Sequence, residues 1–244
     1  MLRALVALLL ASPAFAESTF VNPAGDDAND CLTAWTPCKT LQAAANKAGS
    51  VGHVSIADGT YYGGTHVLYH RMVNFTGNCL TPGAVVISSP GAAAFTAQDH
   101  AILTAQCLDV VGDAGSIGFY SRQFAIIDAF HVRFGAMNVH VIANEKSKIN
   151  LQHETILGGA SYHIMASGQS MVIEGGPVSI GSGVGFYAWA WTGLQSLIMA
   201  GGATISGSAT GHRYINDSSS VITQPPGGFP GNQPGQCEPG CIVK

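Results

Sequence analysis

Three residues in the middle of the chain have the types and spacing for acid–base chemistry or for binding an anion. Asp109 and Arg133 lie 24 residues apart, and His131 precedes Arg133 by two positions. A histidine can take up a proton near neutral pH, and a guanidinium stabilises negative charge. A carboxylate and a guanidinium on neighbouring strands also fit a simple ion pair on a wetted surface. Asp109, His131 and Arg133 are therefore the candidate catalytic residues, with the ion pair as the alternative.

Apolar residues repeat at this same interval from residue 100 to residue 223. One series has gaps of 24, 24, 24 and 25 residues: Leu108, Val132, Ile156, Ile180 and Ile205. A second has gaps of 24, 23, 23, 26 and 24: Ile102, Ile126, Ile149, Val172, Ile198 and Ile222. A serine series follows the same period: Ser147, Ser170, Ser196 and Ser220. Such a repeat, without heptads, predicts an all-β solenoid, the parallel β-helix.

Each apolar series also predicts which residues face solvent, because successive side chains of a strand point to opposite faces. The neighbours of the first series are mostly polar and include Asp109, His131 and Arg133. The neighbours of the second series are mainly apolar, apart from Lys148, Asn150 and the terminal Thr223. A parallel sheet with two apolar faces is normally covered. We expect the C-terminal tail or another subunit to cover this second face.

The N-terminus has the features of a bacterial export signal. Arg3 precedes an apolar run over residues 4–11, and Ala14-Phe15-Ala16 provides a small-residue cleavage site. We expect residues 1–16 to be removed on export to the periplasm or the cell exterior. The run is too short to span a bilayer, and no second apolar run of membrane length follows. A formal net charge of −4 with only 10 Lys and Arg indicates no nucleic-acid partner.

Six cysteines in an exported chain predict disulfide bonds. Their spacing favours two short loops and one link between neighbouring turns: Cys31–Cys38, Cys237–Cys241 and Cys79–Cys107. Zinc is the alternative, but no histidine-rich loop supports it. The acidic run from Gly25 to Cys31 could hold calcium, but such a run is more often a set of Asx turns in a solvated loop. Neither another metal nor a cofactor is indicated.

The mature chain divides into three segments. Residues 17–50 contain a short strand and a helix from about Thr36 to Ala48, with Thr36 or Thr40 as N-cap, and this helix would cover the first turn. Residues 51–223 form the coil. Residues 224–244 are rich in Pro and Gly, which provide few ladder donors or side chains, so we expect an irregular tail.

The start of the mature chain resembles pectin-lyase-like proteins. The matching segments are Val21 to Asp27, Cys31, Pro37 to Ala44 and Ile56 to Tyr61. Beyond residue 61 the resemblance rests on the period alone, and the Pro/Gly tail is similar to that of bacterial prophage-like members. The resemblance implies a single right-handed parallel β-helix with a short capping helix. Because this fold includes polysaccharide-acting enzymes and trimeric tailspikes, it also implies a polysaccharide ligand and self-association as a trimer.

Two functions fit these observations. The first is a secreted β-helix that binds extracellular or cell-surface glycan, or presents a surface to it, without catalysing a reaction. Exposed aromatic rings on one strand would stack on sugars, or else pack inside the coil: Tyr187, Trp189 and Trp191. The alternative is a polysaccharide lyase acting on uronate polymers, with His131 as base and Arg133 stabilising the developing charge. Three further acidic residues lie near these candidates, on the same or the next turn of the predicted coil: Asp113, Asp128 and Glu154.

Overall fold

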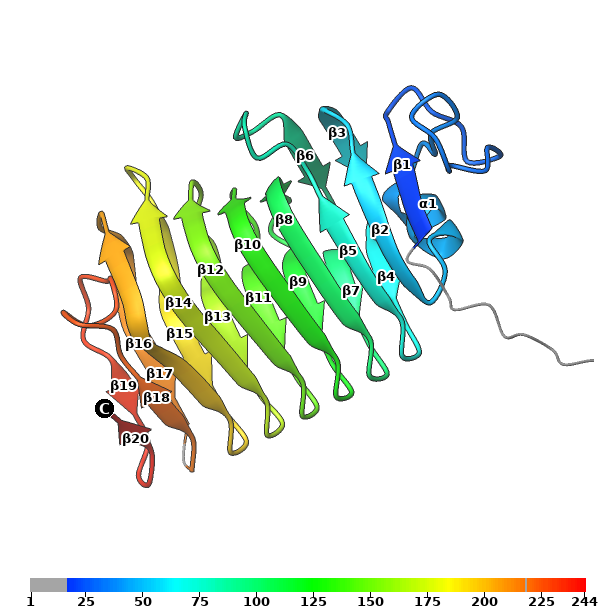
Figure 1. Ribbon diagram of the computed structural model, residues 1–244. Coiled ribbons are helices and arrows are strands. Elements are labelled where there is room, and N and C mark those ends of the chain that lie inside the picture. Colours follow the sequence, from blue (N-terminus) through cyan, green and yellow to red (C-terminus); the bar gives the residue numbers. More distant parts are fainter. Residues whose placement is uncertain (1–16, 218) are drawn as a thin grey trace, which may run out of the picture.

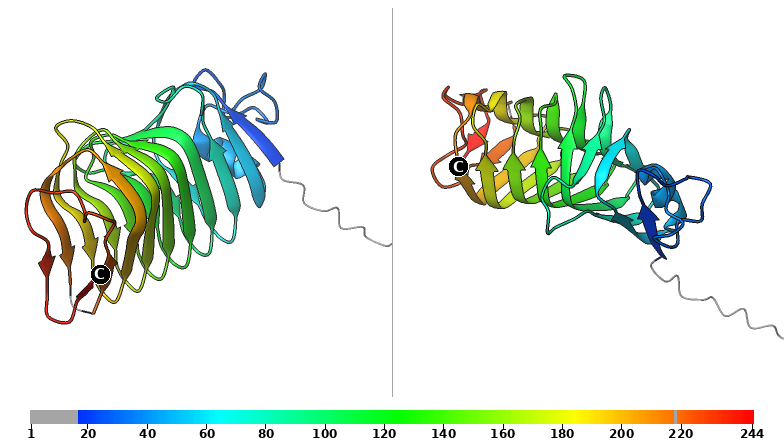
Figure 2. Two further views of the ribbon diagram at one scale, coloured as in Figure 1. Left: turned by 60° about the vertical axis from the view of Figure 1, so that its left-hand side comes forward. Right: turned by 90° about the horizontal axis from the view of Figure 1, so that it is seen from above.

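The computed structural model describes residues 17–217 and 219–244, so the expected export signal lies outside the described residues. These residues form a parallel β-helix, in which the strands of successive turns pair along two sheets of 12 and 8 strands (Figure 1). Together with a single described helix, this confirms the predicted all-β solenoid. Figure 2 shows the turns stacked along one axis, with the helix at the N-terminal end.

The 12-stranded sheet carries the longer strands. Its central path runs through β1 (Glu17–Val21), β2 (Val51–Ile56), β5 (Met72–Thr76), β8 (Ile102–Val111), β10 (Ile126–Phe134), β12 (Lys148–Ile156), β14 (Met171–Ile180), β16 (Leu197–Ser206), β18 (Val221–Thr223) and β20 (Ile242–Val243). Two shorter strands, β3 (Gly59–Tyr62) and β6 (Val85–Ser88), pair with each other, and β6 pairs with the second half of β8.

The eight-stranded sheet lies on the other side of the coil. It comprises β4 (Thr65–Val67), β7 (Ala93–Ala97), β9 (Ile117–Ser121), β11 (Val139–Ala143), β13 (Ala160–Ala166), β15 (Gly185–Thr192), β17 (Thr210–Asn216) and β19 (Gln236–Cys237). The core between the two sheets contains a series of stacked and edge-on rings, including Phe75, Phe95, Phe119 and Phe134.

A residue with positive φ bends each of the long central strands near its middle. Cys107, His131 and His153 have φ values of 59°, 52° and 58°, and Gly176 faces His153 on the next turn with φ of 80°. In the earlier turns the corresponding halves are separate strands, β2 and β3 or β5 and β6. Each central turn therefore has three faces, and His131 lies at the corner between two of them.

Tight turns of one kind lead from the eight-stranded sheet back to the long strands. In each, two adjacent residues have positive φ, as at Gln123–Phe124 and Glu145–Lys146. Beside these turns the backbone N–H of Ser147 donates to the Ser170 hydroxyl at 3.2 Å, and Ser170 donates in the same way to Ser196. The predicted serine series is thus a buried ladder that satisfies backbone donors at the turns.

The apolar series predicted to begin at Ile102 lies on the face formed by the first halves of the long strands, which we call the first face. It follows a different register from the one predicted. The inward positions are Leu103, Ile127, Ile149, Val172, Ile198 and Ile222. Ile102 and Ile126 point outward, one position away from the prediction. The reason is that turn length varies: the paired residues Ile127 and Ile149 are 22 positions apart, whereas Val172 and Ile198 are 26 apart. A constant period therefore drifts out of register.

The series predicted to begin at Leu108 lies on the second face, formed by the second halves of the long strands. The prediction combined residues from two different columns of this face. Leu108 and Val132 continue to Glu154 and Val178, while Ile156 and Ile180 continue the column of Phe134. A glutamate therefore occupies an inward position between valines on the neighbouring turns. The outer neighbours of this face form the polar column predicted from the sequence, with Asp109 and Arg133 paired in register.

The helix α1 (Leu41–Lys47) covers the first turn, as predicted. Thr40 is its N-cap, and its hydroxyl accepts a hydrogen bond from the backbone N–H of Ala43 at 3.2 Å. Leu41, Ala44 and Ala45 are buried against the coil. The helix thus closes the apolar end of the solenoid and limits pairing at its edge.

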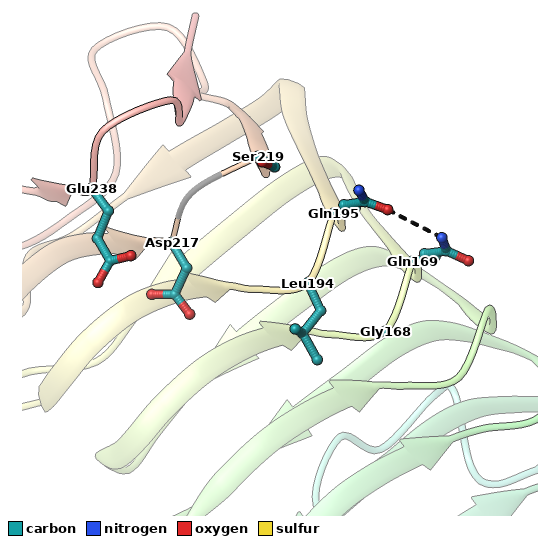
Figure 3. Close-up of a pocket in the computed structure, with 7 residues that line it drawn as sticks. All are labelled: Gly168, Gln169, Leu194, Gln195, Asp217, Ser219 and Glu238. Carbon is teal, nitrogen blue, oxygen red and sulfur yellow. Dashed lines mark hydrogen bonds between the residues drawn. The ribbon is translucent and has the colours of Figure 1, made fainter.

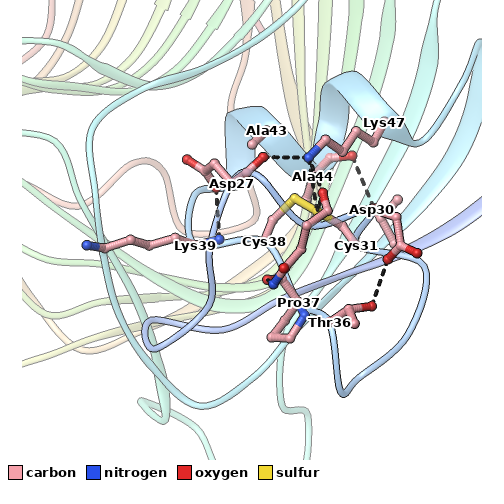
Figure 4. The surroundings of a disulfide bond; sticks show 12 residues. Asp27, Asp30, Cys31, Thr36, Pro37, Cys38, Lys39, Ala43, Ala44 and Lys47 are labelled. Atoms are coloured by element: carbon pink, nitrogen blue, oxygen red, sulfur yellow. Dashed lines mark hydrogen bonds between the residues drawn. A yellow bond between two sulfur atoms is a disulfide. The ribbon is translucent and has the colours of Figure 1, made fainter.

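The acidic run before α1 is held by the chain itself (Figure 4). Oδ1 of Asp27 accepts hydrogen bonds from the backbone N–H groups of Lys39 and Thr40, both at 2.8 Å. Burial acts to raise the pKa of Asp27, but these hydrogen bonds outweigh it and lower the pKa. Asp30 accepts from Leu32 N–H at 3.1 Å. These contacts are those of Asx turns and a helix cap.

All three predicted disulfides are present: Cys31–Cys38, Cys79–Cys107 and Cys237–Cys241. The tail is irregular only up to Gly235, because the short strands β19 and β20 then extend both sheets. Ile242 and Val243 have the branched side chains that favour strands. Across the described ranges, no helix combines the length and apolar character needed to cross a bilayer.

An outer stripe of mainly apolar residues runs along the first face. It comprises Val51, Met72, Ile102, Ile126, Lys148, Met171, Leu197, Val221 and Ile242, which are aligned by strand pairing and all partly or largely exposed. The tail lines a hollow with Ile205, Ala209 and Arg213 at the C-terminal end of the coil. The expectation that the tail covers the stripe is therefore wrong, because the tail packs elsewhere.

Candidate functional site

The three predicted catalytic residues meet in one outer pocket of about 150 Å³. Asp109, His131 and Arg133 line one side, and the loop from Asn78 to Gly83 lines the other. The Cys79–Cys107 disulfide ties this loop to β8. At Gly83 the backbone passes so near that a Cβ atom would lie 3.0 Å from Nη2 of Arg133. The loop is thus a fixed wall beside the guanidinium.

Asp109 holds Arg133 in place through the expected ion pair. Nη2 of Arg133 donates to Oδ2 of Asp109 at 2.8 Å. The Arg133 side chain is 30% exposed and that of Asp109 only 10%. Burial raises the pKa of Asp109, and the hydrogen bond and charge of Arg133 oppose this shift. Oδ1 of Asp109 and Nε of Arg133 are buried without a hydrogen-bond partner, so a ligand in the pocket meets the exposed part of the Arg133 side chain.

His131 is exposed at the rim of the outer pocket. Its ring stacks on that of His153 from the next turn, with centroids 4.6 Å apart and planes inclined by 22°. Both residues occupy the positive-φ corner, which directs their rings away from the core. The outer pocket therefore combines a fixed guanidinium with the imidazole of His131, and the imidazole of His153 lies beside it. Such a group of donors suits an anionic or hydroxyl-rich ligand.

Two of the three other acidic residues considered from the sequence lie away from this pocket. Asp113 accepts hydrogen bonds from Gly115 N–H and the Ser116 hydroxyl in a turn. Asp128 accepts a hydrogen bond from the amide of Asn150 at 2.5 Å on another face. The third, Glu154, points into the coil. Asp109 is therefore the one carboxylate among the described residues that line the outer pocket.

The predicted aromatic surface on β15 is only partly present. Trp189 is fully buried, against His163 at a centroid distance of 4.4 Å, so it cannot stack on a sugar. Strand β15 is irregular here: its pairing with β17 shifts register between Gly185 and Ala188, and Trp189 is buried together with both of its neighbours, Ala188 and Ala190. Tyr187 remains 57% exposed and packs edge-on against Tyr162, while Trp191 is half-buried. These two rings belong to the eight-stranded sheet, away from the outer pocket.

A second charged group lies inside the coil and was not identified from the sequence. Glu154 on β12, His163 on β13 and Glu174 on β14 form this inner cluster, and all three side chains are fully shielded from solvent. Nε2 of His163 lies 3.4 Å from one carboxylate oxygen of each glutamate. Burial acts to lower the pKa of His163, but the carboxylates outweigh it and raise the pKa to about 9. Burial also raises the pKa of Glu154.

A wider hollow of about 550 Å³ follows the turns near the C-terminal end (Figure 3). Asp217 and Glu238 point into it, and the amides of Gln169 and Gln195 are hydrogen-bonded at 3.1 Å along its edge. Burial and the nearby charge of Glu238 raise the pKa of Asp217. None of its described lining residues is basic. This hollow is less suited to an acidic ligand than the outer pocket.

Comparison with solved structures agrees with the fold. The structure of Escherichia coli YbhC aligns with a TM-score of 0.51 at 14% identity, covering 91% of this chain and 75% of that one. The pectin methylesterase from Aspergillus niger aligns with a TM-score of 0.40 at 12% identity, covering 94% and 86%. No family model matches the sequence, and no curated protein matches it. At this identity the likeness to YbhC concerns the fold, a parallel β-helix.

Proposed function

We propose that this protein is an exported β-helix that binds acidic extracellular glycan through the outer pocket, without transforming it. The observation that carries the proposal is the Arg133 guanidinium, fixed by Asp109 and bordered by a disulfide-anchored loop. A fixed guanidinium recognises a carboxylate by paired hydrogen bonds and loses little entropy on binding. His131 and His153 add donors or ring surfaces beside it.

The size of the outer pocket limits what it can take. At about 150 Å³ it is smaller than the ~300–1,000 Å³ of ordinary small-molecule sites, so it accommodates one carboxylate or the edge of one sugar ring. The remainder of a polymer would lie across the polar column that continues through Thr155 and Ser179. Uronate chains, which carry a carboxylate on each ring, match this arrangement.

The ion pair between Asp109 and Arg133 favours binding over hydrolysis or lyase chemistry, because it engages the carboxylate of the outer pocket. Hydrolysis of a glycoside ordinarily requires two carboxyl groups at a defined separation, and among the described residues that line the outer pocket Asp109 is the one carboxylate. Asp109 is also engaged by Arg133, which leaves His131 as the available base. His131 beside Arg133 is the observation that keeps a uronate lyase as the second candidate.

Affinity electrophoresis through gels containing polygalacturonate, alginate or a neutral glucan tests the binding proposal. We expect retardation by at least one uronate polymer and none by the glucan. Arg133→Gln should weaken binding about 10–100-fold, the loss of a charged hydrogen bond. Arg213→Gln removes the same charge from an exposed position near the tail and should leave binding unchanged. Equal retardation of both variants would contradict the proposal.

Ultraviolet absorbance of the unsaturated product separates binding from lyase activity. With the same polymers, with and without calcium, we expect no increase in absorbance. An increase that His131→Ala abolishes, with the circular dichroism spectrum unchanged, would replace the binding proposal by the lyase alternative. Tyr187→Ala and Trp191→Ala provide a comparison on the other sheet, and both should retain uronate binding.

We also propose that the protein assembles as a trimer through the outer stripe. A stripe of this length, left open, would expose contiguous apolar surface along the whole solenoid, which monomeric proteins rarely do. Multi-angle light scattering of the mature protein should give three times the chain mass. Leu197→Lys should shift the mass toward the monomer, whereas Ser179→Lys, on the polar column, should not. A monomeric wild-type protein would rule out this assembly.

A further inference from the structure

The inner cluster places two carboxylates in positions that apolar residues occupy on neighbouring turns. Glu154 continues the inward column of Leu108, Val132 and Val178. Glu174 pairs with Leu151, itself buried, in the adjacent column. Burying an unpaired carboxylate is far more costly than burying an aliphatic side chain. Two such replacements meeting at one histidine therefore require a counter-charge inside the coil.

A hydrogen bond from His163 to His140 fixes the orientation of His163 at the centre of the inner cluster. His140 lies with Nε2 at 3.1 Å from the carbonyl oxygen of Gly135, which can only accept, so this nitrogen carries the proton. With the proton of its neutral ring on Nε2, His140 has Nδ1 as an acceptor. Nδ1 of His163 lies 2.9 Å from that atom and therefore donates to it. Nε2 of His163 consequently faces the two carboxylates.

The geometry points to a divalent metal ion, Zn²⁺ or a similar first-row ion, bound by Glu154, His163 and Glu174. We propose this as a structural metal site inside the coil. The ligand atoms of the three residues lie within 4.8 Å of one another. With metal–ligand distances of ~2.0–2.2 Å, neighbouring ligands of a tetrahedral ion are about 3.3–3.6 Å apart. The two separations of 3.4 Å from Nε2 fall within that interval.

The same separations are too long for the other counter-charge, a proton on His163. A charged N–H to carboxylate hydrogen bond is usually about 2.7–2.9 Å long. Neither carboxylate oxygen of Glu154 or Glu174, nor Nε2 of His163, has a hydrogen-bond partner. Four oxygens and one nitrogen are thus free to ligate. Two carboxylates with a divalent ion make a neutral unit, which is the state that a closed apolar interior favours.

The surroundings of the inner cluster resemble those of metal ions bound in other proteins. A metal-ligating histidine usually donates its other ring N–H to an acceptor that fixes its orientation, and His140 takes that part here. Phe134, Phe186 and Trp189 pack around the two histidines and exclude water. The ion would join β12 and β14 of one sheet to β13 of the other. It would therefore act as a link across the core at the middle of the solenoid.

Because the cluster is sealed, the experiment loads the ion during folding. The mature protein, with its disulfides intact, is unfolded in guanidinium, stripped with EDTA, and refolded with Zn²⁺, with Mn²⁺ or without metal. We expect elemental analysis after desalting to give about one metal ion per chain. We also expect the midpoint of thermal unfolding to rise by about 5–10 °C relative to the metal-free protein. Refolding with Co²⁺ should give the visible absorption of a four-coordinate site.

Variants separate metal binding from general effects on folding. Glu154→Gln and Glu174→Gln keep the side-chain shape and should abolish retention of metal, whereas Glu145→Gln, at an exposed turn, should retain it. The double variant Glu154→Val, Glu174→Leu restores apolar columns, so it should fold and show no response to metal. Retention of less than a tenth of an equivalent by wild-type protein, with no thermal shift, would overturn the proposal. Equal retention by the double variant would do the same.

Discussion

Glu154 and Thr155 are neighbours in β12, yet they belong to two different environments. Glu154 faces the interior beside His163, whereas Thr155 continues the outer column of Asp109 and Arg133. In the outer pocket the ion pair stays partly exposed, so water or a ligand can reach the Arg133 side chain, which is 30% exposed. The inner cluster is closed to solvent, so the charge of its two carboxylates has to be balanced inside the coil, by a proton or a metal ion. A step of one residue along β12 therefore separates the inner cluster from the outer polar column.

The largest expected difference between the two regions is in stability. His163→Ala leaves two buried carboxylates without a partner and should lower the free energy of unfolding by about 3–5 kcal/mol. His131→Ala removes an exposed ring and should change it by less than about 0.5 kcal/mol. Urea unfolding followed by tryptophan fluorescence measures both. Similar losses in the two variants would show that the comparison is wrong.

The disulfide at the outer pocket should have an intermediate effect. Replacing Cys79 and Cys107 together by alanine removes a link across 28 residues, and should cost about 2–4 kcal/mol of unfolding free energy. It also frees the loop beside Arg133, so uronate binding should weaken. The matched change at Cys237 and Cys241 removes a link across 4 residues at the far end and should leave binding intact. Calorimetry and gel retardation give the two readouts.

The pH dependence of stability should differ between metal-free and metal-loaded protein. In metal-free protein the pKa of His163 is raised from 6.5 to about 9, so folding favours its protonated form. That contribution is complete below pH 6.5 and is lost as the pH rises through 9. An ion at the inner cluster replaces the proton and removes this decline. Thermal midpoints measured from pH 6 to 10 with and without Zn²⁺ should therefore diverge, and parallel curves would count against the metal.

The smallest expected effect concerns the serine ladder, which belongs to neither region. Ser170→Ala removes the acceptor for Ser147 N–H and should cost about 1 kcal/mol. Ser182→Ala, at an exposed turn, should cost nothing measurable. Both substitutions should leave uronate binding and metal content unchanged. An effect of Ser170→Ala on either would show that the coil transmits local changes between the two regions.

The sequence predicted the coil, the capping helix and all three disulfides, because each depends on local spacing. It also predicted that Asp109 and Arg133 pair, since both residues lie in turns of equal length. It did not predict Glu154 as an inward residue. The turn between β10 and β12 is two residues shorter, so the paired residues Ile127 and Ile149 are 22 positions apart, and Glu154 takes the place expected for Ile156 in the column of Val132. The irregularity of β15 is a different, local cause: simple alternation does not predict that Ala188, Trp189 and Ala190 are all buried.

A signal for the inner cluster was nevertheless present in the sequence. With the correct register, the two glutamates fall in columns where the paired residues on neighbouring turns are Val or Leu. Their meeting with His163 depends on how the two sheets approach across the core, which spacing within one sheet does not determine. Strand register could therefore be predicted in part from the sequence, whereas contacts across the interior required the three-dimensional structure.

Isothermal titration of the mature protein with a defined oligouronate tests the central claim, that the outer pocket binds acidic glycan, most directly. The account predicts saturable binding by wild-type protein that falls about 10–100-fold in Arg133→Gln. Binding should persist unchanged in Arg213→Gln and in the metal-free double variant Glu154→Val, Glu174→Leu. Absence of binding by the wild-type protein, or equal affinity in Arg133→Gln, would contradict it.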